Sequence, residues 1–127
     1  MSYEVKAEPA VNEDIAELVA EDRDAAREAL RLMLALRDNP WLGDELRERY
    51  NLRPLLDCRR ISFDRSDWEG KPRYRLVYRN EPSDGAPGLV RVWSVGPRDR
   101  LVVYARAAAR ITRERAQPRG RRKKGSS

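Results

Sequence analysis

Residues 73–80 read RYRLVYRN, and this stretch decides the fold because apolar and basic side chains alternate along it. A period of two is typical of a β-strand that buries one face and exposes the other. The buried face would hold two tyrosines and a leucine. The opposite face would carry the arginines, which are Arg73, Arg75 and Arg79, with Val77 among them.

The segments on either side have the same character. Residues 58–64 and 89–95 are apolar runs, and residues rich in Gly, Pro and Asp separate all three segments. Such spacing predicts three consecutive antiparallel strands. In the first of them Ile61 and Phe63 share one face, which places Arg60 and Ser62 on the other.

The flanking segments complete the domain. Residues 3–7 alternate like a strand, and residues 15–19 and 25–36 have helical spacing. Residues 41–56, with Gly43 and Pro54, predict a connector with room for a helical turn. Helical spacing returns over residues 101–112, with Asp99 as the expected cap. We therefore predict one α+β domain over residues 1–116, in the order strand, helix, helix, three strands, helix, with a twisted antiparallel sheet and helices packed on one face.

The last residues are different in composition. Residues 117–127 contain no large apolar side chain, so burial cannot offset the entropy of ordering them. We expect a disordered basic tail that adds non-specific affinity for RNA, with a purely solubilising role as the alternative. Its RNA-binding candidates are Arg121, Arg122, Lys123 and Lys124.

Composition restricts the classes of protein. The 127 residues include one cysteine and no histidine, so an internal disulfide is excluded and the usual zinc and iron sites are poorly supplied. The start is polar and carries Glu4 and Glu8, unlike a signal peptide, and no apolar run approaches the ~20 residues of a membrane span. We expect a cytoplasmic protein that uses no metal, cofactor or membrane.

Charge is segregated along the chain. Residues 1–50 hold 7 basic and 13 acidic side chains, a net charge of −6, whereas residues 51–111 hold 13 and 7, a net charge of +6. Residues 112–127 hold 7 basic side chains and 1 acidic side chain. This pattern favours a nucleic acid as partner of the second half. The alternative is that a composition rich in Arg, Asp and Ala scatters charge without function.

The basic residues are expected to gather on one face of the sheet. Arg60 and Arg75 would line it, and the turn 98–100 after the last strand can reach its end. RNA-binding candidates around this cluster are Arg73, Arg79 and Arg100. The alternative is the ordinary alternation of any antiparallel sheet with one solvated face.

Most catalytic constellations are missing from the sequence. It has no histidine to act as a base for a serine or for Cys58, and its glycines do not form a phosphate-binding loop, so we interpret Cys58 as structural. Arginine and tyrosine remain. These suffice for RNA cleavage, because the ribose 2′-hydroxyl is the nucleophile and the protein only moves protons and neutralises the phosphate.

Two motifs now point to a family. Residues 74–78 read YRLVY and residues 92–104 read VWSVGPRDRLVVY. They resemble the YRLVY strand and the SVGxRxxxxxY strand-to-helix junction of the RelE/ParE toxin superfamily. The predicted order of elements is also that of the family, so the resemblance spans about residues 3–112. It implies the toxin of a type II toxin–antitoxin system.

The resemblance also implies roles for single residues. Arg75 would stabilise the cleaved phosphate, Arg98 would stabilise the phosphate or protonate the leaving group, and Tyr104 would be the general base. Two lysines on the second strand contribute in RelE, and here Arg60 and Ser62 stand at those positions. One cation is therefore missing, and the arginine is a poor proton donor or acceptor.

The implied activity is ribosome-dependent cleavage of mRNA by a toxin that is monomeric when free and that forms a hetero-oligomer with its cognate antitoxin. One alternative is a ParE-like gyrase inhibitor, although that branch generally lacks the tyrosine after the SVGxR motif. Another is a non-catalytic RNA-binding protein of the same fold. Tyr104 could also simply pack against the sheet, and Arg75 and Arg98 could form ion pairs with Asp57, Asp64 or Asp99.

Overall fold

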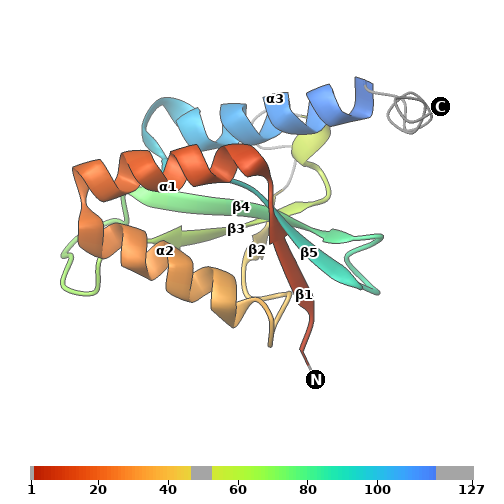
Figure 1. Ribbon diagram of the computed structural model, residues 1–127, viewed down its shortest axis with the longest axis horizontal. Coiled ribbons are helices and arrows are strands. Elements are labelled where there is room, and N and C mark those ends of the chain that lie inside the picture. Colours follow the sequence, from red (N-terminus) through yellow and green to blue (C-terminus); the bar gives the residue numbers. More distant parts are fainter. Residues whose placement is uncertain (1, 47–52, 117–127) are drawn as a thin grey trace.

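Five strands and three α-helices build the domain, as a computed structural model shows for residues 2–46 and 53–116 (Figure 1). The elements are β1 (Glu4–Ala7), α1 (Pro9–Glu21), α2 (Arg23–Ala35), β2 (Asp44–Glu45), the 3₁₀ turn η2 (Arg53–Leu55), β3 (Cys58–Phe63), β4 (Tyr74–Glu81), β5 (Leu89–Pro97), the 3₁₀ turn η3 (Asp99–Leu101) and α3 (Val102–Ala116).

The sheet has the order β1-β5-β4-β3-β2, with β4 at its centre. The neighbours of β4 are antiparallel to it, whereas β1 pairs with β5 in parallel. In this register Arg75 lies between Ser62 of β3 and Gly96 of β5, and Arg60 lies opposite Val77. The basic positions of β3 and β4 are thus neighbours near the start of β4.

The helices α1 and α2 cover one face of the sheet. Asp22 begins α2 by accepting a hydrogen bond from the Ala25 N–H (3.2 Å), a regular N-cap. The buried alanines of α2, including Ala25 and Ala29, bring it close to the sheet. They pack against the face that carries Tyr74, Leu76 and Tyr78, as the alternation predicts.

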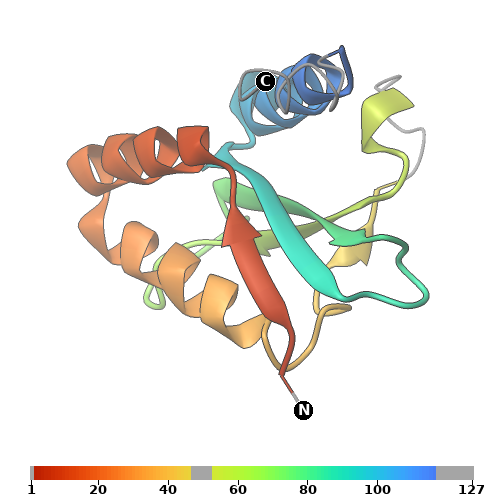
Figure 2. The same cartoon turned by 45° about the vertical axis from the view of Figure 1, so that its right-hand side comes forward.

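The opposite face is covered by α3 (Figure 2). Tyr104 and Ile111 of this helix are fully buried against Val77 and Trp93 of the sheet. A register shift between Val77 and Tyr78 marks a bulge beside Trp93. The two helices expected across one face are α1 and α2, whereas α3 covers the opposite face, which was expected to stay open. The apolar side of α3 also has to be buried, and it packs against the second face of the sheet.

The predicted α+β class and the order of the main elements are confirmed. The parallel β1–β5 pair and the short β2 were not predicted. The connector does contain a helical turn, η2. Asp99 lies inside η3 and is not the cap of a helix, whose first residue is Val102. The predicted tail, residues 117–127, lies outside the described residues.

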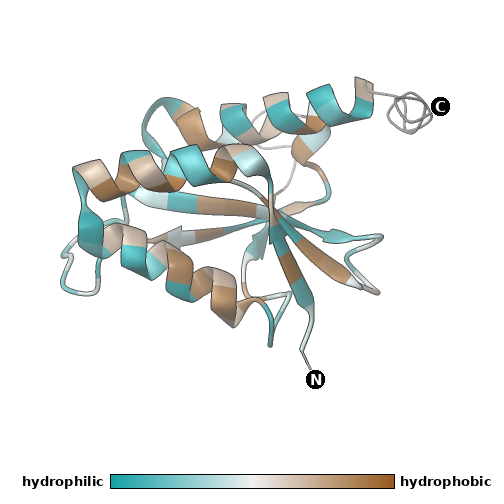
Figure 3. Cartoon of the chain, in the orientation of Figure 1, coloured by the Kyte–Doolittle hydropathy of each residue, from teal (hydrophilic) through white to brown (hydrophobic). Residues whose placement is uncertain are grey.

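The hydrophobic residues of the sheet lie where helices pack on its two faces. Figure 3 shows that β4 is hydrophobic in its middle part, where helices pack on both sides. Among the described residues no helix is long and apolar enough to cross a membrane.

Candidate active site

Four of the predicted site residues converge from four separate elements. Arg60 lies on β3, Arg75 on β4, Arg98 at the turn after β5, and Tyr104 in the first turn of α3. The Arg98 N–H donates to the Arg73 carbonyl oxygen (2.9 Å), which holds the turn against the start of β4. The Arg60 Nη1 donates to the Tyr104 hydroxyl oxygen at 3.3 Å.

Arg75 is the buried member of this cluster. Its side chain is 8% exposed, and its Nη1 donates to the carbonyl oxygens of Pro72 (2.9 Å) and Tyr74 (2.8 Å). Across residues 2–46 and 53–116 its Nε has no hydrogen-bond partner, and no carboxylate forms an ion pair with it. Burial lowers the pKa of Arg75, and nearby Arg60 and Arg98 lower it further, whereas Tyr104 raises it.

These features describe a place for an anion. A buried cation is costly unless an opposite charge accompanies it, and two further guanidinium groups increase that cost. An incoming phosphate would remove this cost, because it supplies the missing negative charge. The alternative role of Arg75 and Arg98, in ion pairs with carboxylates, is not seen within the part of the chain that the structure describes.

Tyr104 packs against the sheet and also reaches the arginine cluster. Its ring is fully buried between α3 and the sheet, in contact with the apolar core around Val77 and Trp93. Its hydroxyl group nevertheless meets the arginine cluster through Arg60. Because no part of Tyr104 is exposed, a ribose can reach its hydroxyl only if a neighbouring side chain moves.

The turn that carries Arg98 is strained. Arg100 and Leu101 have φ angles of 54° and 56°, in the left-handed region that favours glycine. Such a conformation costs about 1 kcal/mol or more for each residue, and it is often found at functional sites. The strained turn exposes both Arg98 and Arg100 next to the start of β4.

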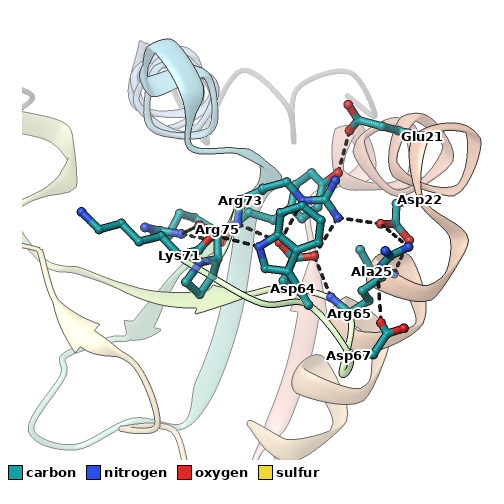
Figure 4. A network of polar contacts seen from close by, with 12 residues as sticks. Glu21, Asp22, Ala25, Asp64, Arg65, Asp67, Lys71, Arg73 and Arg75 are labelled. Carbon is teal, nitrogen blue, oxygen red and sulfur yellow. Dashed lines mark hydrogen bonds and ion pairs between the residues drawn. The ribbon is translucent and has the colours of Figure 1, made fainter.

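Arg73 does not join the cluster, contrary to the prediction (Figure 4). Its guanidinium binds Asp64 with Nε–Oδ2 and Nη2–Oδ1 distances of 2.9 and 2.8 Å, and it donates to Asp22 at 2.7 Å. It also stacks on Trp68, 3.7 Å from the ring centroid. Its bond to Asp64, above all, raises the pKa of Arg73. The reason is that β4 begins only at Tyr74, so Arg73 can turn to the helical side.

Arg79 is likewise occupied. It binds Glu81 (2.8 Å) and lies over Trp93, 5.3 Å from the ring centroid, beside a cavity of about 700 Å³ at the other end of β4. It is therefore not part of the surface around Arg75. The four tail candidates, Arg121, Arg122, Lys123 and Lys124, lie outside the described residues.

One structural residue was missed. Asp14 of α1 is 2% exposed and accepts hydrogen bonds from Arg110 (2.7 Å), Arg106 (3.2 Å) and the Val95 N–H (3.0 Å). It thereby fastens α3, which carries Tyr104, to α1 and β5. The signal was available in the sequence, because Asp14 falls on the buried stripe of α1 with Val11 and Leu18.

Cys58 has no catalytic features. It is 1% exposed, and burial raises the pKa of its thiol to about 12, so the reactive thiolate is scarce near neutral pH. The structural interpretation of Cys58 agrees with this environment.

Comparison with solved structures supports the fold. No protein-family model matches the chain, and no curated protein matches it significantly. A mutant of the Escherichia coli toxin RelE in the free state is 24% identical, with a TM-score of 0.59 over 87% of this chain and 99% of that one. The toxin–antitoxin complex RelBE2 of Mycobacterium tuberculosis gives 20% identity and a TM-score of 0.52 over 77% of this chain and 100% of that one. The chain thus has a RelE-like fold.

Proposed function

We propose that the chain is the toxin of a toxin–antitoxin pair and cleaves mRNA on the ribosome. The observation that carries this proposal is the convergence of Arg60, Arg75, Arg98 and Tyr104, with Arg75 buried and joined to no described carboxylate. The RelE-like fold is consistent with it.

The proposed chemistry uses side chains alone. Arg75 and Arg98 hold the scissile phosphate and neutralise the charge that develops on it. The ribose 2′-oxygen attacks the phosphorus as its proton passes to the oxygen of Tyr104. Arg60, whose Nη1 lies 3.3 Å from the Tyr104 hydroxyl oxygen, holds that oxygen within the cluster. The products are a 2′,3′-cyclic phosphate and a 5′-hydroxyl.

Burial of Tyr104 defines a binding step before this reaction. The 2′-hydroxyl has to take the place that Arg60 occupies at the Tyr104 hydroxyl, where Nη1 lies 3.3 Å away. Arg60 would then turn to the phosphate or the attacking oxygen. Ribosome-bound mRNA, held in one conformation, is a suitable substrate for a site that must first be opened.

An antitoxin is the proposed partner. The M. tuberculosis structure is itself a toxin–antitoxin complex. A protein that covers the cluster of Arg60, Arg75 and Arg98 needs acidic side chains there, because each covered cation would otherwise lose its solvation without gaining an opposite charge. We propose a cytoplasmic monomer that forms a hetero-oligomer with this partner.

The test is single-turnover cleavage of mRNA on programmed ribosomes. Tyr104→Phe removes only the hydroxyl, and Arg98→Ala removes an exposed cation. Each should lower the cleavage rate about a hundredfold or more while ribosome binding persists. Thermal melts establish that the variants are folded. Wild-type rates in a folded Tyr104→Phe protein would remove tyrosine from the mechanism.

A second candidate is an RNA-binding protein of this fold that does not cleave. The complete burial of Tyr104 favours it, since a hydroxyl that never meets substrate cannot act as a base. Tight ribosome or RNA binding without cleavage by the wild type would select this candidate. Inhibition of gyrase, with neither binding nor cleavage of RNA, would instead select the ParE-like alternative.

A further inference from the structure

Two residues of the strand-to-helix motif stand apart from the arginine cluster. Ser94 and Gly96 of β5 precede Arg98 in the sequence, and both are buried. A hydroxyl in an apolar layer costs free energy unless it forms a hydrogen bond, and a glycine in a strand often marks a place where another group approaches closely. Each of these two residues has a specific neighbour on α3.

Ser94 ties the start of α3 to the sheet. It is fully buried, and its Oγ donates to the Val103 carbonyl oxygen at 2.8 Å. Val103 directly precedes Tyr104 in the first turn of the helix. The turn before the helix has positive φ angles at Arg100 and Leu101, so α3 begins from strained backbone. The hydrogen bond from Ser94 therefore holds the backbone from which the Tyr104 side chain extends.

Ser94 and Arg60 lie at the two ends of one row across the sheet. Val77 of β4 is opposite Ser94 of β5 on one side and opposite Arg60 of β3 on the other. Residues that are directly opposite each other on neighbouring strands point to the same face. Tyr104 belongs to the same apolar cluster as Val77, and its hydroxyl oxygen lies 3.3 Å from the Arg60 Nη1. Neighbouring residues of α3 are thus held at opposite ends of the row, the Val103 carbonyl at one end and the Tyr104 hydroxyl at the other.

Gly96 helps to hold α3 on the other side of Tyr104, because it has no side chain. A Cβ at Gly96 would lie 2.9 Å from the Arg106 Nη1, closer than real Cβ atoms approach. The same Nη1 donates to the Val95 carbonyl oxygen (3.3 Å) and to the Asp14 carboxylate (3.2 Å). Arg106 forms these bonds in the space that the missing side chain leaves. The motif therefore fastens the helix both before and after Tyr104.

Resting on the proposed function, we propose that Ser94 is a positioning residue of the site, which acts through Tyr104. Its bond to Val103 sets where the phenol oxygen lies relative to Arg60 and the ribose 2′-hydroxyl. Proton transfer needs a hydrogen bond between the two oxygens, and a misplacement of about 1 Å can cost up to about a hundredfold in rate. Loss of one neutral hydrogen bond usually changes the stability of a fold only modestly. Ser94 therefore affects the reaction more than it affects folding.

The experiment is a double-mutant cycle in single-turnover cleavage on programmed ribosomes. Ser94→Ala should lower the rate about tenfold or more when Tyr104 is present, because the phenol oxygen is no longer held in place. In a Tyr104→Phe protein the same change should alter the residual rate by less than about twofold, since the oxygen that Ser94 positions is absent. Thermal melts establish which variants are folded.

Tyr78→Phe is the matched control. It also removes a buried hydroxyl, which donates to the Pro40 carbonyl oxygen (2.7 Å), but Tyr78 faces α1 and α2 on the opposite side of the sheet. Because Tyr78 shares no bonding partner with Ser94, this variant should cleave within about threefold of the wild type.

A second readout needs no cleavage. 3-Fluorotyrosine at position 104 gives one fluorine resonance in the free protein. Ser94→Ala should shift this resonance, whereas Tyr78→Phe should leave it unchanged, because only the first change releases α3 at Val103.

The outcomes separate this inference from the function on which it rests. No cleavage by the wild type would remove the proposed function, whereas an unmoved fluorine resonance in the Ser94→Ala protein would overturn the positioning of Tyr104. If the wild type cleaves, a Ser94→Ala protein with the wild-type rate would also overturn it. Equal losses with and without the Tyr104 hydroxyl, or a Ser94→Ala protein that does not fold, would show that Ser94 serves the fold as a whole and not Tyr104.

Discussion

The arginines on and just before β4 are used in two opposite ways. At the far end Arg79 is bound by Glu81, and just before the strand Arg73 is bound by Asp64 and Asp22. Arg75 lies between them, is buried, and forms no ion pair with a carboxylate of the described residues. The alternating pattern of the sequence does not distinguish among these three arginines. The difference teaches that an arginine with protein partners holds the fold, whereas a buried arginine without an anion is available to a ligand.

Replacing these arginines should separate the two roles. Arg75→Ala removes a cation from the phosphate and should lower the cleavage rate about a hundredfold to a thousandfold, as loss of one charge-stabilising group does in other enzymes. Arg79→Ala should leave the rate of the folded protein within about threefold. Single-turnover cleavage measures both. Equal losses in the two variants would contradict the distinction between paired and unpaired arginines.

Loss of the Asp14 carboxylate, which fastens α3 to α1 and β5, should have a large effect on stability. Asp14→Asn leaves Arg106 and Arg110 without their buried counter-charge, and breaking such a pair costs about 3 kcal/mol or more. We expect the free energy of unfolding in urea to fall by about that amount. Asp57→Asn, at an exposed position, serves as the control and should change it by less than about 0.5 kcal/mol. An Asp14→Asn protein as stable as the control would show that Asp14 does not fasten α3 to the rest of the fold.

Acid should weaken the ion pairs that Arg73 forms with Asp22 and Asp64. Burial acts to raise the pKa values of Asp22 and Asp64, but hydrogen bonds from Arg73 and from backbone N–H groups outweigh it and hold both below 3.8. A depressed folded-state pKa stabilises the protein above the unfolded value of about 3.9, and that contribution disappears as the pH falls through the folded value.

The measurement is the free energy of unfolding between about pH 5 and pH 2, for the wild type and for Arg73→Met. The wild type should lose stability over this range more steeply, because only it has the ion pairs of Arg73 to lose. Parallel curves for the two proteins would show that Arg73 contributes nothing through Asp22 and Asp64.

The smallest expected effect concerns the strained turn beside Arg98. Arg100→Gly permits the positive φ of 54° without a Cβ clash and should raise the free energy of unfolding by up to about 1 kcal/mol. Arg98 should keep its position, so cleavage should fall only through the loss of one exposed cation. Unfolding in urea gives the answer, and destabilisation by glycine would contradict strain at this turn.

The sequence predicted the strands well, because alternation and turn residues are local signals. The face covered by α3 was not predictable in this way, since its alanines make more than one side of the helix apolar. The pairing of Arg73 with Asp22 joins residues 51 positions apart, and no local pattern reveals it. The motif around Arg98 and Tyr104 predicted which residues meet, but the burial of Tyr104 depends on how α3 packs.

The central claim is that the cluster of Arg60, Arg75, Arg98 and Tyr104 cleaves RNA through the ribose 2′-hydroxyl. The most direct measurement is the chemistry of the ends that the wild-type protein leaves on mRNA bound to programmed ribosomes. We predict a 2′,3′-cyclic phosphate on the upstream fragment and a 5′-hydroxyl on the downstream one. Intact mRNA, or fragments with a 3′-hydroxyl and a 5′-phosphate, would contradict the account.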